Sequence, residues 1–327
     1  MRNKSALSRS KLSTRPQLHP RNRHLAKKGA SYDLAALSKV NPELQPYVLT
    51  NEHANRSINF ADHKAVKELN RALLLHFYDL QFWDLPEQFL CPPVPGRVDY
   101  IHYLADLIAD STGLTNIKTK AITGLDIGTG ANLIYPIVGS HEYQWRFVGS
   151  DIDKMSLDCA KNLIQFNPRL KSQVKLRMQT NSSAIFDGII KQTERFTFSM
   201  CNPPFHESQQ AAESGTNRKL QNLNKHKKQS VSNRSLNFGG RQNELWCEGG
   251  ERQFVSNMIG ESRAYKDQVL WFTSLVSKKD NLPFIYTELK KIKASQVKTI
   301  DMAQGNKTSR FVAWSFLTES EHQSWFK

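Results

Sequence analysis

The sequence has few cysteines and no long apolar segment. Its four cysteines, Cys91, Cys159, Cys201 and Cys247, stand far apart, so neither a zinc site with C-x-x-C spacing nor a disulfide framework is indicated. No apolar run approaches the roughly 18 residues that a membrane span needs, and none follows the basic N-terminus as in a secretory signal. We therefore expect a cytoplasmic protein with neither a metal nor a membrane anchor; a basic transit peptide is excluded less firmly.

Acidic residues are also scarce. The 30 Asp and Glu residues are outnumbered by 45 Lys and Arg, which gives a formal net charge of +15 and a pI of about 9.6. Such a balance indicates a polyanionic partner, which is either nucleic acid or an anionic membrane surface. The cations are concentrated in two stretches of the chain that contain no acid.

The first stretch, residues 1–32, contains nine Lys or Arg and few apolar residues. We expect it to be a disordered basic tail that attracts RNA, although a purely solubilising tail has the same composition. The second stretch, between Glu213 and Glu244, contains seven Lys or Arg. Because so long a connection is uncommon inside a compact domain, we expect residues 206–245 to form a mobile basic loop.

Helical periodicity dominates residues 33–110. Val66, Leu69 and Leu73 recur at helical spacing within residues 62–75. A proline-rich stretch then interrupts the pattern as an extended connector, and a second amphipathic helix is predicted over residues 100–110. We expect this region to form a helical cap on a domain that spans residues 111–327.

Short apolar strand signals alternate with helical signals beyond the cap. This alternation is typical of βαβ units and predicts an α/β domain, with a mostly parallel sheet and helices on both faces. The last two strands are expected to pair antiparallel, because only a short loop separates them. The predicted strands are 122–126, 145–149, 174–178, 196–200, 268–276, 296–302 and 310–317.

A glycine-rich turn, Asp126-Ile127-Gly128-Thr129-Gly130, follows the first of these strands. Glycines at a strand end let the backbone approach a nucleotide closely. A dinucleotide fingerprint would carry a third glycine, but Leu133 stands at that position. S-adenosylmethionine has no phosphate, and its ammonium group attracts a carboxylate such as Asp126. We therefore predict that Asp126, Gly128 and Gly130 bind S-adenosylmethionine.

A second acid, Asp151, ends the next strand, 25 residues after Asp126. This spacing is near the roughly 20 residues at which an acid meets the ribose of a nucleotide. The two carboxylate oxygens can accept hydrogen bonds from both ribose hydroxyls. An ordinary turn acid is the alternative, and the neighbouring glycine turn favours ribose binding.

The segment Asn202-Pro203-Pro204-Phe205 directly follows the strand predicted at 196–200. An exocyclic amine of a base is a poor nucleophile, because its lone pair is delocalised into the ring. The carbonyl of Asn202 and a backbone carbonyl can accept its two hydrogens, which aims the nitrogen at a methyl donor. Proline stiffens such a turn, and Phe205 offers a face on which an extruded base stacks. The four residues are therefore predicted to be catalytic; a proline-rich structural turn is the alternative.

Together, these motifs resemble the family that joins bacterial ribosomal RNA large subunit methyltransferase F enzymes and methyltransferase-like 16 proteins. The resemblance extends in order over about residues 90–320. The basic N-terminal segment and the absence of a long C-terminal extension favour the bacterial branch. The matching stretches are Pro92-Pro93-Val94-Pro95-Gly96-Arg97 with the following 98–102, then 125–131, 202–205, 249–251 with 254–255, and 313–316.

The resemblance implies a Rossmann-like, seven-stranded class I methyltransferase sheet. It also implies S-adenosylmethionine-dependent N6-methylation of the adenine at position 1618 of 23S ribosomal RNA, either free or in an assembly intermediate. Cofactor contacts are implied for Arg97, Gly128, Asp151 and Asn202. Ser182 occupies a family position usually held by threonine.

Several alternatives are compatible with the sequence. The motif at 202–205 also serves guanine-N2 methyltransferases and enzymes that methylate a glutamine amide, although a protein substrate fits the basic charge poorly. A non-catalytic RNA-binding assembly factor could keep the same fold. Arg97 could also pair with an acid and hold the cap, instead of contacting the cofactor.

Overall fold

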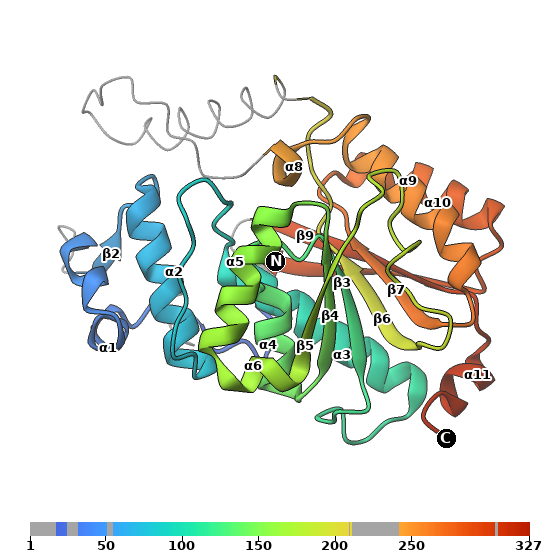
Figure 1. The fold of residues 1–327 in the computed structure, drawn as a ribbon, viewed down its shortest axis with the longest axis horizontal. Coiled ribbons are helices and arrows are strands. Elements are labelled where there is room, and N and C mark those ends of the chain that lie inside the picture. The colour runs from blue at the N-terminus through green and yellow to red at the C-terminus, as the bar shows by residue number, and fades with distance from the viewer. Residues whose placement is uncertain (1–17, 25–31, 51–54, 209, 211–241, 305–306) are drawn as a thin grey trace, which may run out of the picture.

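A computed structural model describes residues 18–24, 32–50, 55–208, 210, 242–304 and 307–327. Its centre is a seven-stranded sheet with the order β5-β4-β3-β6-β7-β9-β8 (Figure 1). The strands from β5 to β7 in this order are parallel, whereas β9 is antiparallel to both β7 and β8. The strands are β3 Thr123–Ile127, β4 Arg146–Asp151, β5 Val174–Met178, β6 Phe196–Cys201, β7 Val269–Leu275, β8 Gln296–Gln304 and β9 Lys307–Ser315.

Each segment that the sequence predicts as a strand forms a strand of this sheet, and the last two pair antiparallel as expected. Successive residues of a strand point their side chains to opposite faces of the sheet, and helices cover both faces. Phe147 packs into the hydrophobic cluster on the face covered by α3, α4 and α5, whereas Val148 packs into the cluster beneath α9 and α10. These helices are α3 Val94–Thr112, α4 Ile134–Tyr143, α5 Lys154–Phe166, α9 Gly250–Ser262 and α10 Leu282–Lys291.

Aspartates cap three of the helices, and the first, Asp33, accepts from the backbone N–H of Ala36 at 3.0 Å at the start of α1 (Leu34–Val40). The side chain of Asp62 accepts a hydrogen bond from the backbone N–H of Lys64 at 2.9 Å and so caps α2 (His63–Tyr78). Asp153 caps α5 in the same way, by accepting from the N–H of Ser156 at 3.0 Å. The shorter helical elements are α1 Leu34–Val40, η1 Pro42–Tyr47, α6 Pro168–Gln173, α8 Gln242–Leu245, η2 Arg263–Tyr265, η3 Lys279–Asn281 and α11 Glu319–Ser324.

The region predicted as a helical cap is not helical throughout. Besides α1, η1 and α2, it contains a short antiparallel pair, β1 (Val48–Thr50) and β2 (Arg56–Ile58), which the helical pattern does not predict. α3 begins within the proline-rich stretch, because Pro95 fits the first turn of a helix, where no N–H partner is needed. The hydroxyl of Tyr100 on α3 lies 2.7 Å from that of Thr273 on β7. α3 therefore packs with the sheet, and the boundary expected at residue 110 stays a prediction.

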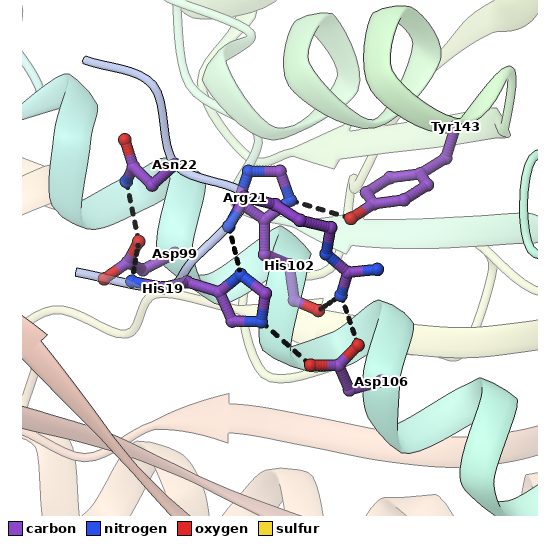
Figure 2. A network of polar contacts seen from close by, with 7 residues as sticks. All are labelled: His19, Arg21, Asn22, Asp99, His102, Asp106 and Tyr143. Atoms are coloured by element: carbon purple, nitrogen blue, oxygen red, sulfur yellow. Dashed lines mark hydrogen bonds and ion pairs between the residues drawn. The ribbon is translucent and has the colours of Figure 1, made fainter. Parts of the chain in front are cut away.

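Within the tail predicted at residues 1–32, the structure describes residues 18–24, which we call the strap, in contact with the fold. The strap crosses α3, where Figure 2 shows His19 beside Asp106. It also contacts the ends of α2 and α4, and both His19 and His24 are buried. Its histidines and Asn22 have specific polar partners, which a count of charges does not reveal. Residues 1–17 and 25–31 of the predicted tail, and 209 and 211–241 of the predicted loop, lie outside the described residues.

Membrane-spanning helices and metal sites, which the sequence predicts to be absent, can be assessed over the described residues. Within them, no helix has the length and apolar character that a membrane crossing requires. The same part of the chain brings together no group of three or more His, Cys, Asp or Glu side chains suited to a metal ion. No disulfide joins the four cysteines, all of which lie among the described residues.

Candidate active site

The predicted site residues follow three adjacent strands. β3 lies between β4 and β6, and all three are parallel, so their carboxyl ends meet at one edge of the sheet. In the strand register, Ile127 pairs with Ser150 on one side and with Cys201 on the other. The glycine turn, Asp151 and Asn202 therefore emerge side by side, at the edge where open α/β sheets bind ligands.

The glycine turn needs glycine for its backbone conformation. Gly128 has φ 67° and Gly130 has φ 64°, in the left-handed region that other residues rarely adopt. Between them, Thr129 fixes the turn to β4, because its N–H donates to the carbonyl of Ser150 at 2.9 Å. The Thr129 side chain occupies the space beside Gly149, where an added Cβ would lie 2.9 Å from Thr129 Oγ1.

Asp126 is a fully buried carboxyl group at the end of β3. Its Oδ2 accepts a hydrogen bond from the hydroxyl of Thr129 at 2.7 Å, whereas Oδ1 has no hydrogen-bond partner among the described residues. Burial raises the pKa of Asp126 to about 7; the Thr129 hydrogen bond opposes the rise, and the charge of Asp151 adds to it. A buried acceptor without a partner at this position suits a ligand that brings a cation or a donor.

Asp151 closes the other side of the turn. Its Oδ2 accepts from the N–H of Gly130 at 2.9 Å, and its Oδ1 accepts from the N–H of Asp153 at 2.9 Å. Burial raises the pKa of Asp151, although these backbone hydrogen bonds oppose the rise. Each carboxylate oxygen keeps a further lone pair, so the group can still accept from two hydroxyls.

Arg97 reaches this edge from the first turn of α3. Its Nη1 donates to Asn202 Oδ1 at 2.9 Å and to the hydroxyl of Tyr135 at 3.1 Å. Among the described residues, the guanidinium of Arg97 therefore contacts Asn202 and Tyr135 and not an acid of the cap. Because a guanidinium only donates, it faces the oxygen of the Asn202 amide and holds its orientation. Burial raises the pKa of Tyr135 to about 12, so this hydroxyl stays neutral.

The turn at 202–205 leaves β6 as irregular backbone. Pro203 is buried, whereas Asn202, Pro204 and Phe205 are half-buried. The next residue, His206, donates its N–H to the carbonyl of Leu245 at 3.1 Å and accepts from the N–H of Cys247 at 3.2 Å. The two ends of the predicted basic loop are thus joined beside Phe205.

Ser182 is more exposed than the predicted site residues Asp126, Asp151 and Asn202, which are buried or half-buried. It lies in an exposed turn after β5. The start of that turn is tied to the site, because the N–H of Gln179 donates to the carbonyl of Asp151 at 2.9 Å. The structure therefore places Ser182 at the same edge of the sheet as Asp151, and its side chain makes no hydrogen bond to another described residue.

Known proteins are similar to this chain in sequence. A family described as RNA methyltransferase matches residues 12–318. The chain is 54% identical over 316 residues to ribosomal RNA large subunit methyltransferase F of Shewanella denitrificans. The matched residues make up 95% of this chain and 86% of the relative. The Flavobacterium johnsoniae protein of the same name is 51% identical over 313 residues, covering 96% and 98%. The chain belongs to this methyltransferase F family of RNA methyltransferases.

Solved structures share the fold of this family member. The hMettl16 catalytic domain in complex with MAT2A 3'UTR hairpin 6 has a TM-score of 0.73 at 30% identity, over 92% of this chain and 98% of that one. The N-terminal domain of human METTL16 in complex with SAH has a TM-score of 0.71 at 28% identity, over 92% and 99%. The seven-stranded sheet is therefore the class I methyltransferase fold that the resemblance implies.

Two residues near the site of this methyltransferase F family member were not identified from the sequence. One is Tyr135, whose contact with Arg97 has no local signal. The other is Glu244, whose Oε2 accepts from the N–H of Leu90 at 3.0 Å and whose Oε1 lies 3.7 Å from a Cβ built on Gly130. Its signal was available, because Glu244 is the first acid after a long stretch without one.

The motif Gly249-Gly250-Glu251 connects the loop after β7 with the segment that follows Phe205. The buried carboxylate of Glu251 accepts from the N–H of Ser277 and from the side-chain amide of Asn281, both at 2.7 Å. These bonds fix the loop after β7. A Cβ on Gly250 would lie 2.7 Å from the Cγ of Glu207, so glycine allows this turn to pack against the segment after Phe205.

Proposed function

We propose that this protein transfers a methyl group from S-adenosylmethionine to the exocyclic N6 amine of an adenine in 23S ribosomal RNA. By family resemblance, that adenine is at position 1618. The observation that carries the proposal is the position of Asn202. Its amide oxygen is held by Arg97 at the strand edge, next to the glycine turn, and Asn202 stands three residues before the partly exposed Phe205.

The glycine turn and the two acids fit S-adenosylmethionine. Gly128 and Gly130 bring backbone close to the ligand, and the unpartnered Oδ1 of Asp126 suits the ammonium group of its methionine part. Asp151 keeps lone pairs for the ribose hydroxyls. When bound, S-adenosylmethionine supplies an electrophilic methyl group on its sulfonium sulfur. Ser182 is assigned to the same pocket by resemblance alone.

The turn at 202–205 has the groups that an exocyclic amine needs. An amide oxygen has two lone pairs, and Arg97 uses one, so Asn202 Oδ1 can accept one hydrogen of the amine. A backbone carbonyl of the same turn accepts the other hydrogen. The buried Pro203 keeps the turn rigid, and the face of Phe205 stacks on the base once it leaves its helix.

Charge and family favour RNA as the macromolecular substrate. A net charge of +15 suits a phosphate backbone, and the relatives at about half identity carry a ribosomal RNA name. One solved relative was crystallised with an RNA hairpin. A ribosomal RNA substrate or large-subunit assembly intermediate places the protein in the bacterial cytoplasm, with neither a metal nor a membrane needed.

The test is to incubate purified protein with S-adenosylmethionine and 23S ribosomal RNA from cells that lack it, and to analyse the nucleosides by mass spectrometry. N6-methyladenosine in wild-type reactions, absent with Asn202→Ala, is the expected result. N2-methylguanosine would assign the guanine chemistry instead. RNA binding without any methylated nucleoside, on free RNA and on assembly intermediates alike, would leave an assembly factor with this fold.

A further inference from the structure

The strap, residues 18–24, is fixed to the first half of α3 by a dense set of polar contacts (Figure 2). Asn22 donates its side-chain amide to the carbonyl of Pro95 at 2.8 Å and to Oδ1 of Asp99 at 2.6 Å. The same Asp99 oxygen accepts from the N–H of His19 at 3.1 Å, and His19 Nε2 lies 2.8 Å from Oδ2 of Asp106. The strap therefore contacts three turns of one helix.

These contacts are inside the fold. Asp99 is 0% exposed and His19 is 6% exposed, so each depends on the other to satisfy its polar atoms. Further along, Arg21 donates to the carbonyl of His102 at 2.9 Å, and His24 Nε2 lies 2.6 Å from the hydroxyl of Tyr78 on α2. The strap thus joins α3 to the cap.

The Asn22 contacts are on the side of α3 that faces away from the site. Residues four apart lie on one face of an α-helix, and a residue midway between them lies on roughly the opposite face. Pro95 and Asp99 are four apart, and Arg97 is midway between them. Asn22 therefore holds the first turn of α3 from behind, while Arg97 projects from its front to Asn202.

We propose that Asn22 is a positioning residue for methyl transfer, which acts through Arg97 on Asn202. The inference rests on the proposed function, since it assigns Asn202 to the reacting amine. Without Asn22, the first turn of α3 loses its two rear contacts, and the guanidinium no longer holds the amide oxygen at a fixed point. The strap then serves catalysis itself, apart from any attraction of RNA by the cations around it.

The experiment is a double-mutant cycle with Asn22→Ala, Arg97→Ala and the double variant, measured as single-turnover methylation at saturating RNA. Asn22→Ala is expected to slow the step by up to about 100-fold, as an ångström-scale misplacement does, with little change in RNA affinity. In the Arg97→Ala background, the same substitution should have no further effect. Equal slowing in both backgrounds would show a general structural defect and overturn the proposal, as would an unchanged rate in the single variant.

Arg23→Ala is the matched control from the same segment. Arg23 is 56% exposed and donates to Glu142 at 2.6 Å, away from α3, so its loss should leave the single-turnover rate unchanged. If Asn22→Ala does not fold, Asp99→Asn and Asp99→Ala replace it, because asparagine keeps the acceptor and alanine removes it. Equal rates for these two would also overturn the proposal. An inactive wild type would instead refute the proposed function, so the two failures are distinct.

Discussion

Arg97 on α3 and Asn202 at the end of β6 are joined by a 2.9 Å hydrogen bond, although 105 residues separate them in the sequence. The bond determines that the oxygen of the Asn202 amide, and not its nitrogen, faces the guanidinium, because a guanidinium has no acceptor. It also leaves one lone pair of the oxygen for a substrate hydrogen. Arg97 therefore acts on the chemistry through Asn202, whether or not it also touches the cofactor.

Asn202→Ala should lower the single-turnover methylation rate by about 10²–10³, the usual cost of losing one preorganised polar group at a reacting centre. RNA affinity should change little, because the amide acts on one nitrogen of the substrate. Rapid-quench assays and filter binding measure the two quantities. Asn257→Ala, at an exposed position on α9, is the control and should behave as wild type. An Asn202→Ala rate within a few-fold of wild type would make this residue structural.

Arg97→Ala should also slow methyl transfer, but less than Asn202→Ala, because the amide can still visit the productive orientation. A cost of about 1.5–3 kcal/mol, typical of a hydrogen bond to a charged group, corresponds to about 10- to 150-fold in rate. Arg169→Ala is the control, since Arg169 is exposed on α6, at the opposite edge of the sheet. A rate unchanged by Arg97→Ala would separate the guanidinium from catalysis.

Binding of S-adenosylhomocysteine should strengthen as pH rises through about 7. Asp126 has its pKa raised to about 7 by burial, so only above this pH does it present a carboxylate to the ligand's ammonium group. Calorimetry in buffers of different ionisation enthalpy should detect proton release near pH 7, and Asp126→Asn should abolish the trend. Without ligand the sign reverses: a raised carboxyl pKa means that stability falls as pH rises from about 4 to 7. Identical pH profiles for both proteins would contradict this assignment.

His24 should make stability fall with acid. Burial lowers the pKa of His24 to about 3, so between about 6.5 and 3 the unfolded chain binds a proton that the folded chain does not. Stability from this group is present at neutral pH and declines as pH falls, with a slope of up to about 1.4 kcal/mol per pH unit. Urea unfolding of wild type and His24→Phe should show the smaller pH slope in the variant. Equal slopes would mean that His24 is protonated in the folded state.

Deletion of residues 2–17 should weaken RNA binding without changing the rate at saturating RNA. The deleted segment carries Arg2, Lys4, Arg9, Lys11 and Arg15 but leaves the strap intact. The slope of log affinity against log salt should flatten by about 0.7–0.9 for each phosphate that the protein no longer neutralises. Replacing the five cations with serine is the control for chain length and should give the same slope. An unchanged slope would make the segment a solubiliser.

Much of the site follows from the sequence because strand ends are local features. Asp126, Asp151 and Asn202 each terminate an apolar run, and parallel strands necessarily bring such ends to one edge. These residues could therefore be placed together without knowledge of the strand order. The same locality explains why the positions of the strands themselves are predictable.

The remaining parts depend on docking between distant segments, which leaves no periodic pattern. The contact of Arg97 with Asn202 and that of Glu244 with Leu90 need the tertiary fold. The strap was missed for a related reason. Its composition is that of a disordered tail, and it is held by the burial of His19 and His24 and by the hydrogen bonds of the half-buried Asn22 to partners far along the chain.

The strap also has a consequence for the order of folding during synthesis. It is made early, yet the partner of Asn22 follows 77 residues later and that of Arg23 follows 119 residues later. Until α3 and α4 have emerged from the ribosome, the only one of these strap contacts that can form is that of His24 with Tyr78 on α2. Pairing segments at this sequence separation is slow compared with forming a helix. The strap is thus translated before its partners and is among the last of the described segments to be ordered.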